Sequence, residues 1–151
     1  MSDPIVEASE KGWIATHRDL YLKDGEAGHL WDSTVGGGPG PLPTLLLFTT
    51  GRKSGKQSIM PLLYGKVDTG YAIIASKGGH PKHPGWYHNL KQGAVKLKVA
   101  NDELEVSARD ASGPEREKVW AQMAEMYPPF SQYQESAGDR QIPVVILEPK
   151  D

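Results

Sequence analysis

The chain has 151 residues and a formal net charge of −2, with 38% hydrophobic and 24% charged residues. These values are typical of one ordinary globular domain, and the slightly acidic balance argues against a general nucleic-acid-binding protein. The absence of cysteine excludes disulfides and thiolate sites and suits a reducing, cytoplasmic compartment. No apolar run approaches the roughly 20 residues of a membrane helix, and the acidic start argues against a secretory signal.

The N-terminal region predicts a helix followed by a flexible connector. Residues 4–23 fit a helix in which Val6, Trp13 and Leu20 recur every seven residues. Its mixed charges favour packing on the body of the protein, because the basic face of a membrane-surface helix is missing. Peripheral membrane contact and a lid over the substrate are the alternatives. Residues 35–43 are rich in glycine and proline and predict the connector.

Three strands are predicted in the next part of the chain. Residues 44–50 form a nearly continuous apolar run, which indicates a strand buried on both faces. Residues 58–67 predict a second strand, in which Pro61 implies a bulge or an edge position. A short turn then leads to a third strand at 71–75.

A hairpin is the clearest local prediction, over residues 93–109. Apolar and charged residues alternate through both arms, and a two-residue turn at Asn101-Asp102 gives one register that satisfies both faces. The predicted pairs are Val99 with Leu104, Leu97 with Val106, and Lys98 with Glu105.

The C-terminal part predicts a helix, a loop and a strand. Ser112 and Glu115 have the spacing of a capping box, so a helix is expected from there to about Met126. Residues 127–137 fit a loop or a short helix. Residues 142–147 predict a last strand whose proline marks an edge or a strand start.

These elements predict a mainly β (α+β) fold. About six strands, mostly linked as hairpins, and two or three helices do not alternate as in a parallel βαβ sheet. A small antiparallel barrel with peripheral helices fits better. We expect residues 1–41 to form the N-terminal helix and connector, and residues 42–151 to form the barrel domain.

The strongest chemical cluster is the loop from Gly51 to Lys56, which has three cations and two glycines. It is not a phosphate-binding P-loop, because the glycine spacing is one residue short and Gln57 stands where Ser or Thr is required. Backbone N–H groups near glycines and an arginine fork would suit an acidic or phosphorylated ligand. A solvated basic hairpin tip is the alternative.

Two further clusters follow the third strand. Residues 75–79 could present backbone donors and a hydroxyl to a planar polar ring, or form an ordinary turn. His80, His83 and His88 have no carboxylate among them and lack zinc-site spacing, so no metal is expected.

Three aromatic residues recur at intervals of three: Tyr127, Phe130 and Tyr133. They could line one side of a pocket or pack the end of a helix onto the core. A serine hydrolase is not supported, because the chain has no Gly-x-Ser-x-Gly sequence.

Together these motifs resemble the deazaflavin-dependent nitroreductase and F420H2-dependent quinone reductase family of actinobacteria. The resemblance covers about residues 42–149 and implies a split β-barrel that binds coenzyme F420. The matching stretches are Leu45-Leu46-Leu47-Phe48-Thr49-Thr50-Gly51-Arg52-Lys53-Ser54-Gly55, Pro61-Leu62-Leu63-Tyr64, Ala75-Ser76-Lys77-Gly78-Gly79, Pro84-Gly85-Trp86-Tyr87-His88-Asn89-Leu90, Ala108-Arg109-Asp110, Met126-Tyr127-Pro128 and Ile142-Pro143-Val144.

The resemblance also implies roles for individual residues. The cofactor tail carries a phosphodiester and several glutamates, which Arg52, Lys53 and Lys56 would hold. Ser54, Lys77, Trp86 and Asn89 would lie along the phosphate and tail path. The deazaflavin ring would be lined by Pro61, Leu62, Tyr64, Ala75, Ser76, Lys77, Gly78 and Gly79. Ser76 would sit near the reacting centre, and Tyr127 and Tyr133 would border the substrate pocket.

The expected reaction is hydride transfer from C5 of F420H2 to an electron-poor acceptor, such as a quinone, an enone or a nitro compound. Ser76 or a pocket tyrosine would stabilise or protonate the developing oxyanion. Phe130 replaces the tyrosine of the nitroimidazole-activating relative, which puts activity on such drugs in doubt. The alternatives are an FMN-binding split-barrel reductase and a non-catalytic F420 carrier or storage protein; both a monomer and a homodimer are compatible with the sequence.

Overall fold

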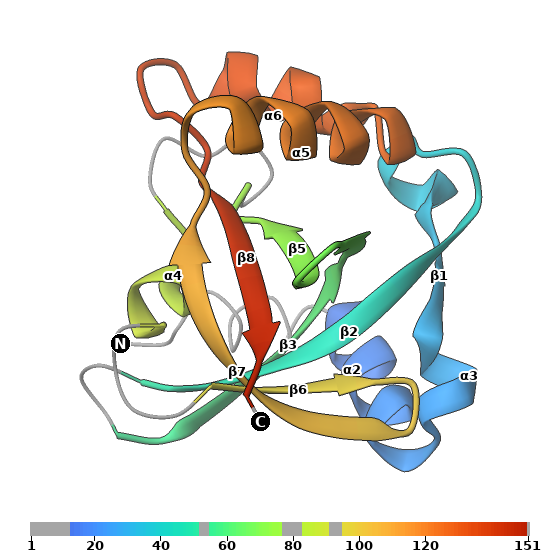
Figure 1. Cartoon of the computed structure of the whole chain (residues 1–151). Helices are drawn as coiled ribbons and strands as arrows, with labels where there is room; N and C mark the ends of the chain where they lie inside the picture. The colour runs from blue at the N-terminus through green and yellow to red at the C-terminus, as the bar shows by residue number, and fades with distance from the viewer. Residues whose placement is uncertain (1–12, 52–54, 77–82, 91–94, 151) are drawn as a thin grey trace.

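The computed structural model describes residues 13–51, 55–76, 83–90 and 95–150, and the side chains within these ranges except those of 13–16, 35 and 36. Figure 1 shows a curled sheet with helices around it. The helices are α2 (Trp13–Lys23), α3 (Gly25–His29), the 3-10 helix η1 (Ser33–Gly36), α4 (Gly85–Asn89), α5 (Gly113–Met126) and α6 (Pro129–Ser136). The strands are β1 (Leu30–Asp32), β2 (Pro41–Thr50), β3 (Gln57–Leu63), β4 (Gly65–Val67), β5 (Gly70–Ile74), β6 (Val95–Val99), β7 (Asp102–Asp110) and β8 (Val144–Pro149).

The sheet is antiparallel throughout and follows the order β1-β2-β6-β7-β8-β5-β4, with β3 paired to β2. This confirms the predicted α+β split barrel. The described residues form eight strands instead of about six, because the three-residue β1 shows too little alternation to detect and the expected strand 58–67 is divided into β3 and β4. Of the bulge or edge position expected for Pro61, the edge is confirmed, since β3 pairs with β2 and with no other strand of the described residues.

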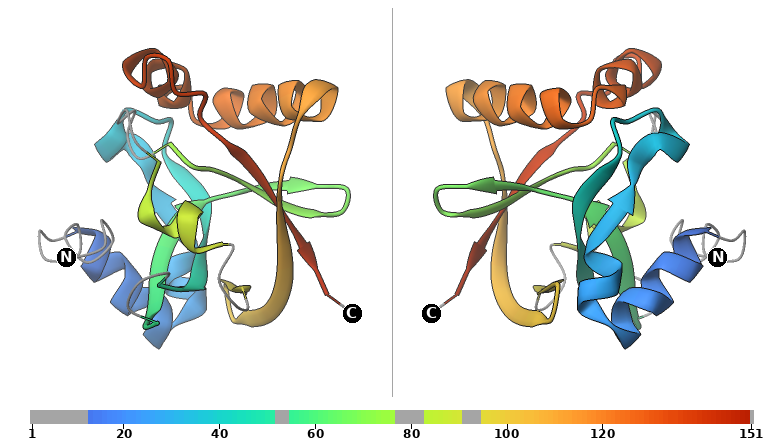
Figure 2. Two further views of the ribbon diagram at one scale, coloured as in Figure 1. Left: turned by 90° about the vertical axis from the view of Figure 1, so that its left-hand side faces the viewer. Right: turned by 90° about the vertical axis from the view of Figure 1, so that its right-hand side faces the viewer.

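Side chains of the sheet divide into three apolar clusters, as the two-residue period of a strand requires. The interior cluster fills the barrel and takes Leu45 and Leu47 from β2. The alternate residues of β2, Leu46 and Phe48, face outward and pack with Tyr21 of α2. The helix-side cluster lies on the outer face of β5 and β8, under α5 and α6 (Figure 2). Because β2 contributes side chains to clusters on both of its faces, the prediction that it is buried on both faces is confirmed.

The N-terminal helix docks on the barrel through a residue that the seven-residue pattern did not select. Leu20 is 43% exposed, whereas Tyr21 is completely buried. The Tyr21 hydroxyl donates to Thr44 O at 2.8 Å and accepts from Ala100 N at 2.7 Å. Burial raises the pKa of Tyr21 to about 12, so the hydroxyl stays protonated. Among the described residues, no helix has the length and apolar character needed to cross a bilayer.

The hairpin of β6 and β7 exists, but its predicted register is wrong. Leu97 pairs with Leu104 and Lys98 with Glu103, so the turn is Ala100-Asn101. A two-residue shift leaves every side chain on the same face, and alternation cannot distinguish the two registers. Two tertiary contacts favour the observed register. Ala100 adopts a left-handed conformation (φ 54°), and its N–H donates to the Tyr21 hydroxyl. Asn101 Oδ1 accepts from Gly25 N at 3.1 Å.

Gly25 allows this contact between α3 and the hairpin turn. A Cβ at this position would lie 2.0 Å from Ala100 O and 2.4 Å from its carbonyl carbon. Neither backbone can move without breaking the Asn101 bond, so only glycine permits the approach.

Other boundaries also differ from the predictions. β2 begins at Pro41, inside the expected connector, because its first residues pair with β1. The expected strand 58–67 is divided at Tyr64 into β3 and β4. The capping box does not form: Ser112 makes no side-chain cap bond, and the Glu115 carboxylate accepts two bonds from Arg109 at 2.6 and 2.8 Å.

We expect Tyr21→Phe to lower the free energy of unfolding by about 1–3 kcal/mol, because Thr44 O and Ala100 N would lose their shared partner. Urea unfolding monitored by circular dichroism measures the change. Tyr71→Phe is the matched control, since no hydrogen bond of the Tyr71 hydroxyl occurs within the described ranges and its ring would still pack on Tyr64. Equal stability of wild type and Tyr21→Phe would show that the hydroxyl bridge contributes nothing.

Candidate functional site

Several of the predicted site segments gather at one edge of the sheet. Four antiparallel steps lead from β2 through β6, β7 and β8 to β5, so β2 and β5 run in the same direction. We call the edge where β2, β5 and β7 end and β6 and β8 begin the loop edge. The β2–β3 loop, α4 and the turn before β8 all lie there, on the left of Figure 1.

The tip of the β2–β3 hairpin is a tight loop. Gly51 N donates to Lys56 O at 2.8 Å, and Gly55 N donates to Gly51 O at 2.9 Å. Gly55 has φ +71°, a left-handed conformation that favours glycine. Lys56 is exposed at this tip. The other predicted tail-binding residues of the loop, Arg52, Lys53 and Ser54, lie outside the described residues.

Several residues predicted around the ring meet in the interior cluster. Tyr64 and Ala75 are buried there, and Leu62 packs against them. Trp86, which was predicted along the tail path, is buried in the same cluster. Pro61 alternates with Leu62 along β3 and therefore faces away from this cluster.

Two predicted site residues, Tyr64 and Asn89, have features that bear on a polar ligand. The Tyr64 hydroxyl lies 2.9 Å from His29 Nε2, and burial raises the pKa of Tyr64. Asn89, at the end of α4, is completely buried.

A buried polar atom lies between the interior cluster and the hairpin tip. Thr49 is 2% exposed, and its Oγ1 has no hydrogen-bond partner in the part of the chain that the structure describes. Thr49 alternates with Phe48 and so shares the inward face of Leu45 and Leu47. A buried hydroxyl without a partner is unfavourable, and a bound ligand or water would remove that penalty.

Ser76 lies just beyond β5 at the loop edge. It is half-buried, and its carbonyl accepts from Arg140 Nη2 at 2.7 Å. Within the described residues its hydroxyl makes no hydrogen bond. Lys77, Gly78 and Gly79 lie outside the described residues.

The two predicted substrate tyrosines contact each other, on a different face from the ring residues. The hydroxyls of Tyr127 and Tyr133 are 3.1 Å apart. Tyr127 and Phe130 are buried in the helix-side cluster, whereas Tyr133 is half-buried. Burial, followed by the bond to Tyr133, raises the pKa of Tyr127, so it remains a proton donor at neutral pH. Tyr127 and Phe130 therefore pack in the core, and the role of Tyr133 at a substrate pocket stays a prediction.

Arg140 is a residue that the sequence reasoning missed. It donates to Ala75 O at 3.0 Å, to Ser76 O at 2.7 Å and to His83 Nδ1 at 2.9 Å. It is a single arginine after a turn and before an apolar strand, and no local motif distinguishes it. His83 and His88 stack edge to face with ring centroids 5.8 Å apart. No group of residues that could hold a metal occurs in the described part of the chain.

We expect His83 to titrate below the usual histidine pKa near 6.5. Arginine can only donate, so Nδ1 accepts and the proton sits on Nε2. Burial lowers the pKa of His83, the charges of Arg140 and His88 lower it further, and Asp110 opposes them. The unfolded chain therefore binds the proton more readily, and stability falls as the pH drops from about 6.5 through the folded pKa.

Imidazole 15N NMR across pH 4–8 checks this expectation, with a His83→Gln variant to assign the resonance. Two further groups lie close by among the described residues: Tyr87, whose ring lies 4.8 Å from that of His83, and Asp110, which accepts from the Tyr87 hydroxyl at 2.7 Å. A pKa at or above 6.5, or a proton on Nδ1, would contradict the observed contact.

The arrangement suits an elongated ligand with one apolar and one acidic end. Five steps along β3 separate Gln57 at the tip from Leu62 at the interior cluster, about 17 Å at 3.3 Å per residue. A flat ring would contact Leu62, Tyr64 and Ala75, and an acidic extension would reach Lys56. The unpaired Thr49 hydroxyl lies on the inward face between the two ends.

Known proteins resemble this chain in sequence and in fold. The family model described as "F420H(2)-dependent quinone reductase" matches residues 23–149. The F420H(2)-dependent quinone reductase Rv1261c of Mycobacterium tuberculosis is 39% identical over 113 residues, which cover 72% of this chain and 75% of that protein.

Two solved structures are also similar. One, described as an F420-H2 dependent reductase, is 44% identical with a TM-score of 0.63, covering 70% of this chain and 94% of that one. Another, described as a domain-swapped dimer, is 39% identical with a TM-score of 0.66, covering 89% and 94%.

Proposed function

This chain belongs to the F420H(2)-dependent quinone reductase family, and we propose that it passes a hydride from reduced F420 to a quinone or another electron-poor acceptor. It is accordingly an F420H2-dependent oxidoreductase. The observation that carries the proposal is the elongated arrangement, in which an apolar cluster and a cationic hairpin tip lie along one strand. FMN has a phosphate but no polyglutamate tail, so it would pair with fewer of the cations at this hairpin tip.

The described residues fit the cofactor. Lys56 would attract the acidic tail, and the Thr49 hydroxyl could satisfy its missing bond on an oxygen of the ligand. Leu62, Tyr64 and Ala75 would line the ring with apolar surface, and Trp86 would lie along the tail path. When bound, F420H2 supplies a hydride from C5, so the protein contributes position and electrostatics.

Two hydroxyl groups are candidate donors to the acceptor, that of Ser76 at the end of β5 and that of Tyr127 on the helix-side face. The Ser76 hydroxyl has no described partner and can donate to an oxygen that gains negative charge. Tyr127 is kept protonated by its raised pKa, so its hydroxyl can donate a hydrogen bond, and it lies 3.1 Å from the Tyr133 hydroxyl. Phe130 provides no such group, so we do not expect nitroimidazole drugs to be oriented as in the relative that has tyrosine there.

A titration with F420 and with FMN at low and moderate salt tests the proposal. We expect micromolar F420 binding that weakens as salt screens the tail contacts, and no FMN binding. Oxidation of F420H2 is then followed with menadione and a panel of enones. A protein that purifies with bound FMN would favour the FMN-reductase alternative, and tight F420 binding without reduction of any acceptor would favour a carrier or storage protein.

A further inference from the structure

The chain leaves β5 with two carbonyl groups that the sheet does not satisfy. Ala75 N donates to Pro143 O at 3.0 Å, which is the last backbone bond between this strand end and the start of β8. The carbonyls of Ala75 and Ser76 then accept from the two terminal nitrogens of Arg140, at 3.0 and 2.7 Å. One planar guanidinium therefore fixes two successive peptide units.

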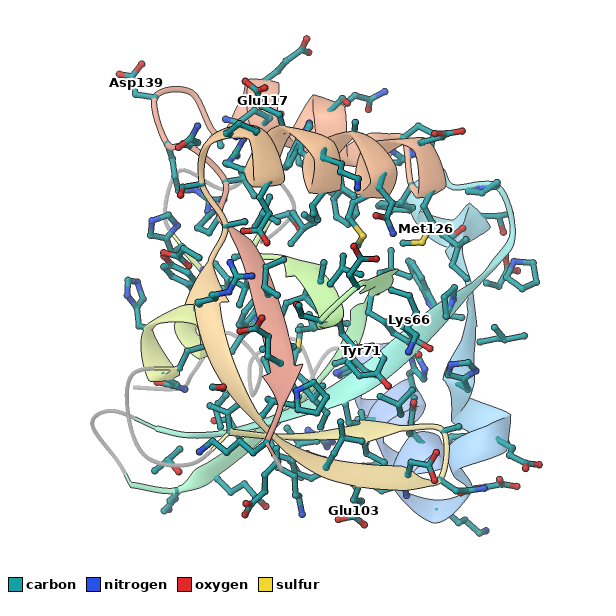
Figure 3. All side chains as sticks on the ribbon, viewed as in Figure 1. Lys66, Tyr71, Glu103, Glu117, Met126 and Asp139 are labelled. Atoms are coloured by element: carbon teal, nitrogen blue, oxygen red, sulfur yellow. The ribbon has the colours of Figure 1, made fainter. Side chains whose placement is uncertain are left out.

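Arg140 is itself held in place by Gln134 of α6. Gln134 Nε2 donates to Arg140 O at 2.7 Å, and Gln134 Oε1 accepts from Ile142 N at 2.9 Å. Figure 3 shows the neighbouring Asp139 pointing away from the body of the protein, at the outer end of this turn. The turn thus directs one charged side chain outward, while Arg140 reaches Ala75 and Ser76.

Arg140 also reaches the segment that carries α4, through His83 Nδ1 at 2.9 Å. Three segments therefore meet on one side chain: the end of β5, the start of the 83–90 segment and the turn after α6. Arg140 is half-buried, and burial lowers its pKa, which shows that a charge is held there against a desolvation penalty. Three acceptors arranged around one guanidinium offset that penalty.

We propose that Arg140 is a positioning residue for hydride transfer, which fixes the Ala75–Ser76 backbone and so aims the Ser76 hydroxyl at the acceptor. The inference rests on the proposed function, and it assigns Arg140 no contact with the cofactor or the acceptor. Small displacements at a reacting centre have large kinetic effects, because transfer needs the donor and acceptor atoms in near-attack geometry. Loss of Arg140 should therefore slow the transfer step more than it weakens F420 binding.

The test compares Arg140→Met and Arg140→Lys with Arg116→Met. Arg116 is the matched control because its Nη2 donates to Ile142 O at 2.6 Å, in the same part of the chain, without touching Ala75 or Ser76. Each variant is measured for F420 affinity by fluorescence, for single-turnover oxidation of F420H2 by menadione, and for amide hydrogen exchange of residues 71–76 without ligand.

For Arg140→Met we expect the transfer rate to fall about 10-fold to 100-fold, with an F420 Kd within about 3-fold of wild type. Exchange at the Ala75 amide should become faster. Arg140→Lys should recover part of the rate, because one ammonium group cannot reproduce the planar fork. Arg116→Met should keep the wild-type transfer rate and exchange.

A wild-type transfer rate in Arg140→Met would overturn the inference, as would equal losses of rate in Arg140→Met and Arg116→Met. If the wild-type protein neither binds F420 nor oxidises F420H2, the proposed function fails and the inference fails with it. If wild type reacts normally and Arg140→Met does so too, only the role of Arg140 fails.

Discussion

Ser76→Ala is expected to lower kcat for a quinone by about 100-fold, because a pre-positioned donor to a developing oxyanion would be lost. The Ser76 carbonyl would keep its bond to Arg140, so the backbone at the end of β5 should not move. The F420 Kd should stay close to the wild-type value, since the alanine removes only the hydroxyl. Steady-state kinetics with menadione and a fluorescence titration of F420 measure the two effects separately.

Two further variants make this result specific. Ser76→Thr keeps a hydroxyl and should recover part of the activity. Ser131→Ala removes an exposed hydroxyl on α6 and should leave kcat unchanged. If Ser76→Ala retains kcat within about 2-fold, the donor is another group, and Tyr127→Phe is then the next variant to examine.

Lys56→Glu is expected to raise the F420 Kd by about 10-fold at low salt, which corresponds to about 1.4 kcal/mol of binding free energy. The change replaces a cation at the hairpin tip by an anion that repels the acidic tail. The difference in Kd from wild type should shrink as salt increases, because salt screens exposed charges from one another. The Debye length is about 10 Å at 0.1 M salt. Fluorescence titrations of F420 at several salt concentrations measure it.

Lys118→Glu is the control, since it makes the same change in net charge on an exposed position of α5. It should leave the F420 Kd unchanged at every salt concentration. Equal effects of the two variants would mean that overall charge, and not a tail contact at the hairpin tip, controls affinity. The predicted role of Lys56 would then be withdrawn.

Local patterns in the sequence were sufficient for most elements of the barrel. The apolar run before Gly51 predicts a strand buried on both faces, and in β2 Leu45 and Leu47 pack in the interior cluster while Leu46 and Phe48 pack against α2. Alternation predicts the β6–β7 hairpin, and Pro61 correctly indicates an edge strand. The cationic tip and the serine after β5 are also visible in the sequence, since both are short contiguous motifs at strand ends.

Features that depend on contacts between distant segments could not be predicted. The register of β6 and β7 follows from Tyr21 and Gly25, about 75 residues away, because a two-residue shift satisfies the same alternation. The seven-residue pattern chose Leu20 because it counts spacing, whereas burial is decided by the surface against which α2 packs.

The sequence by itself determined which residues could form strands and which chemical groups stand at the strand ends, because these depend on neighbours along the chain. The tertiary structure decided which of those groups meet. It placed the Tyr127–Tyr133 pair on the outer face of the barrel sheet and Leu62, Tyr64 and Ala75 inside it. It also brought Arg140 to the end of β5, some 65 residues away, where two carbonyls without strand partners required a donor.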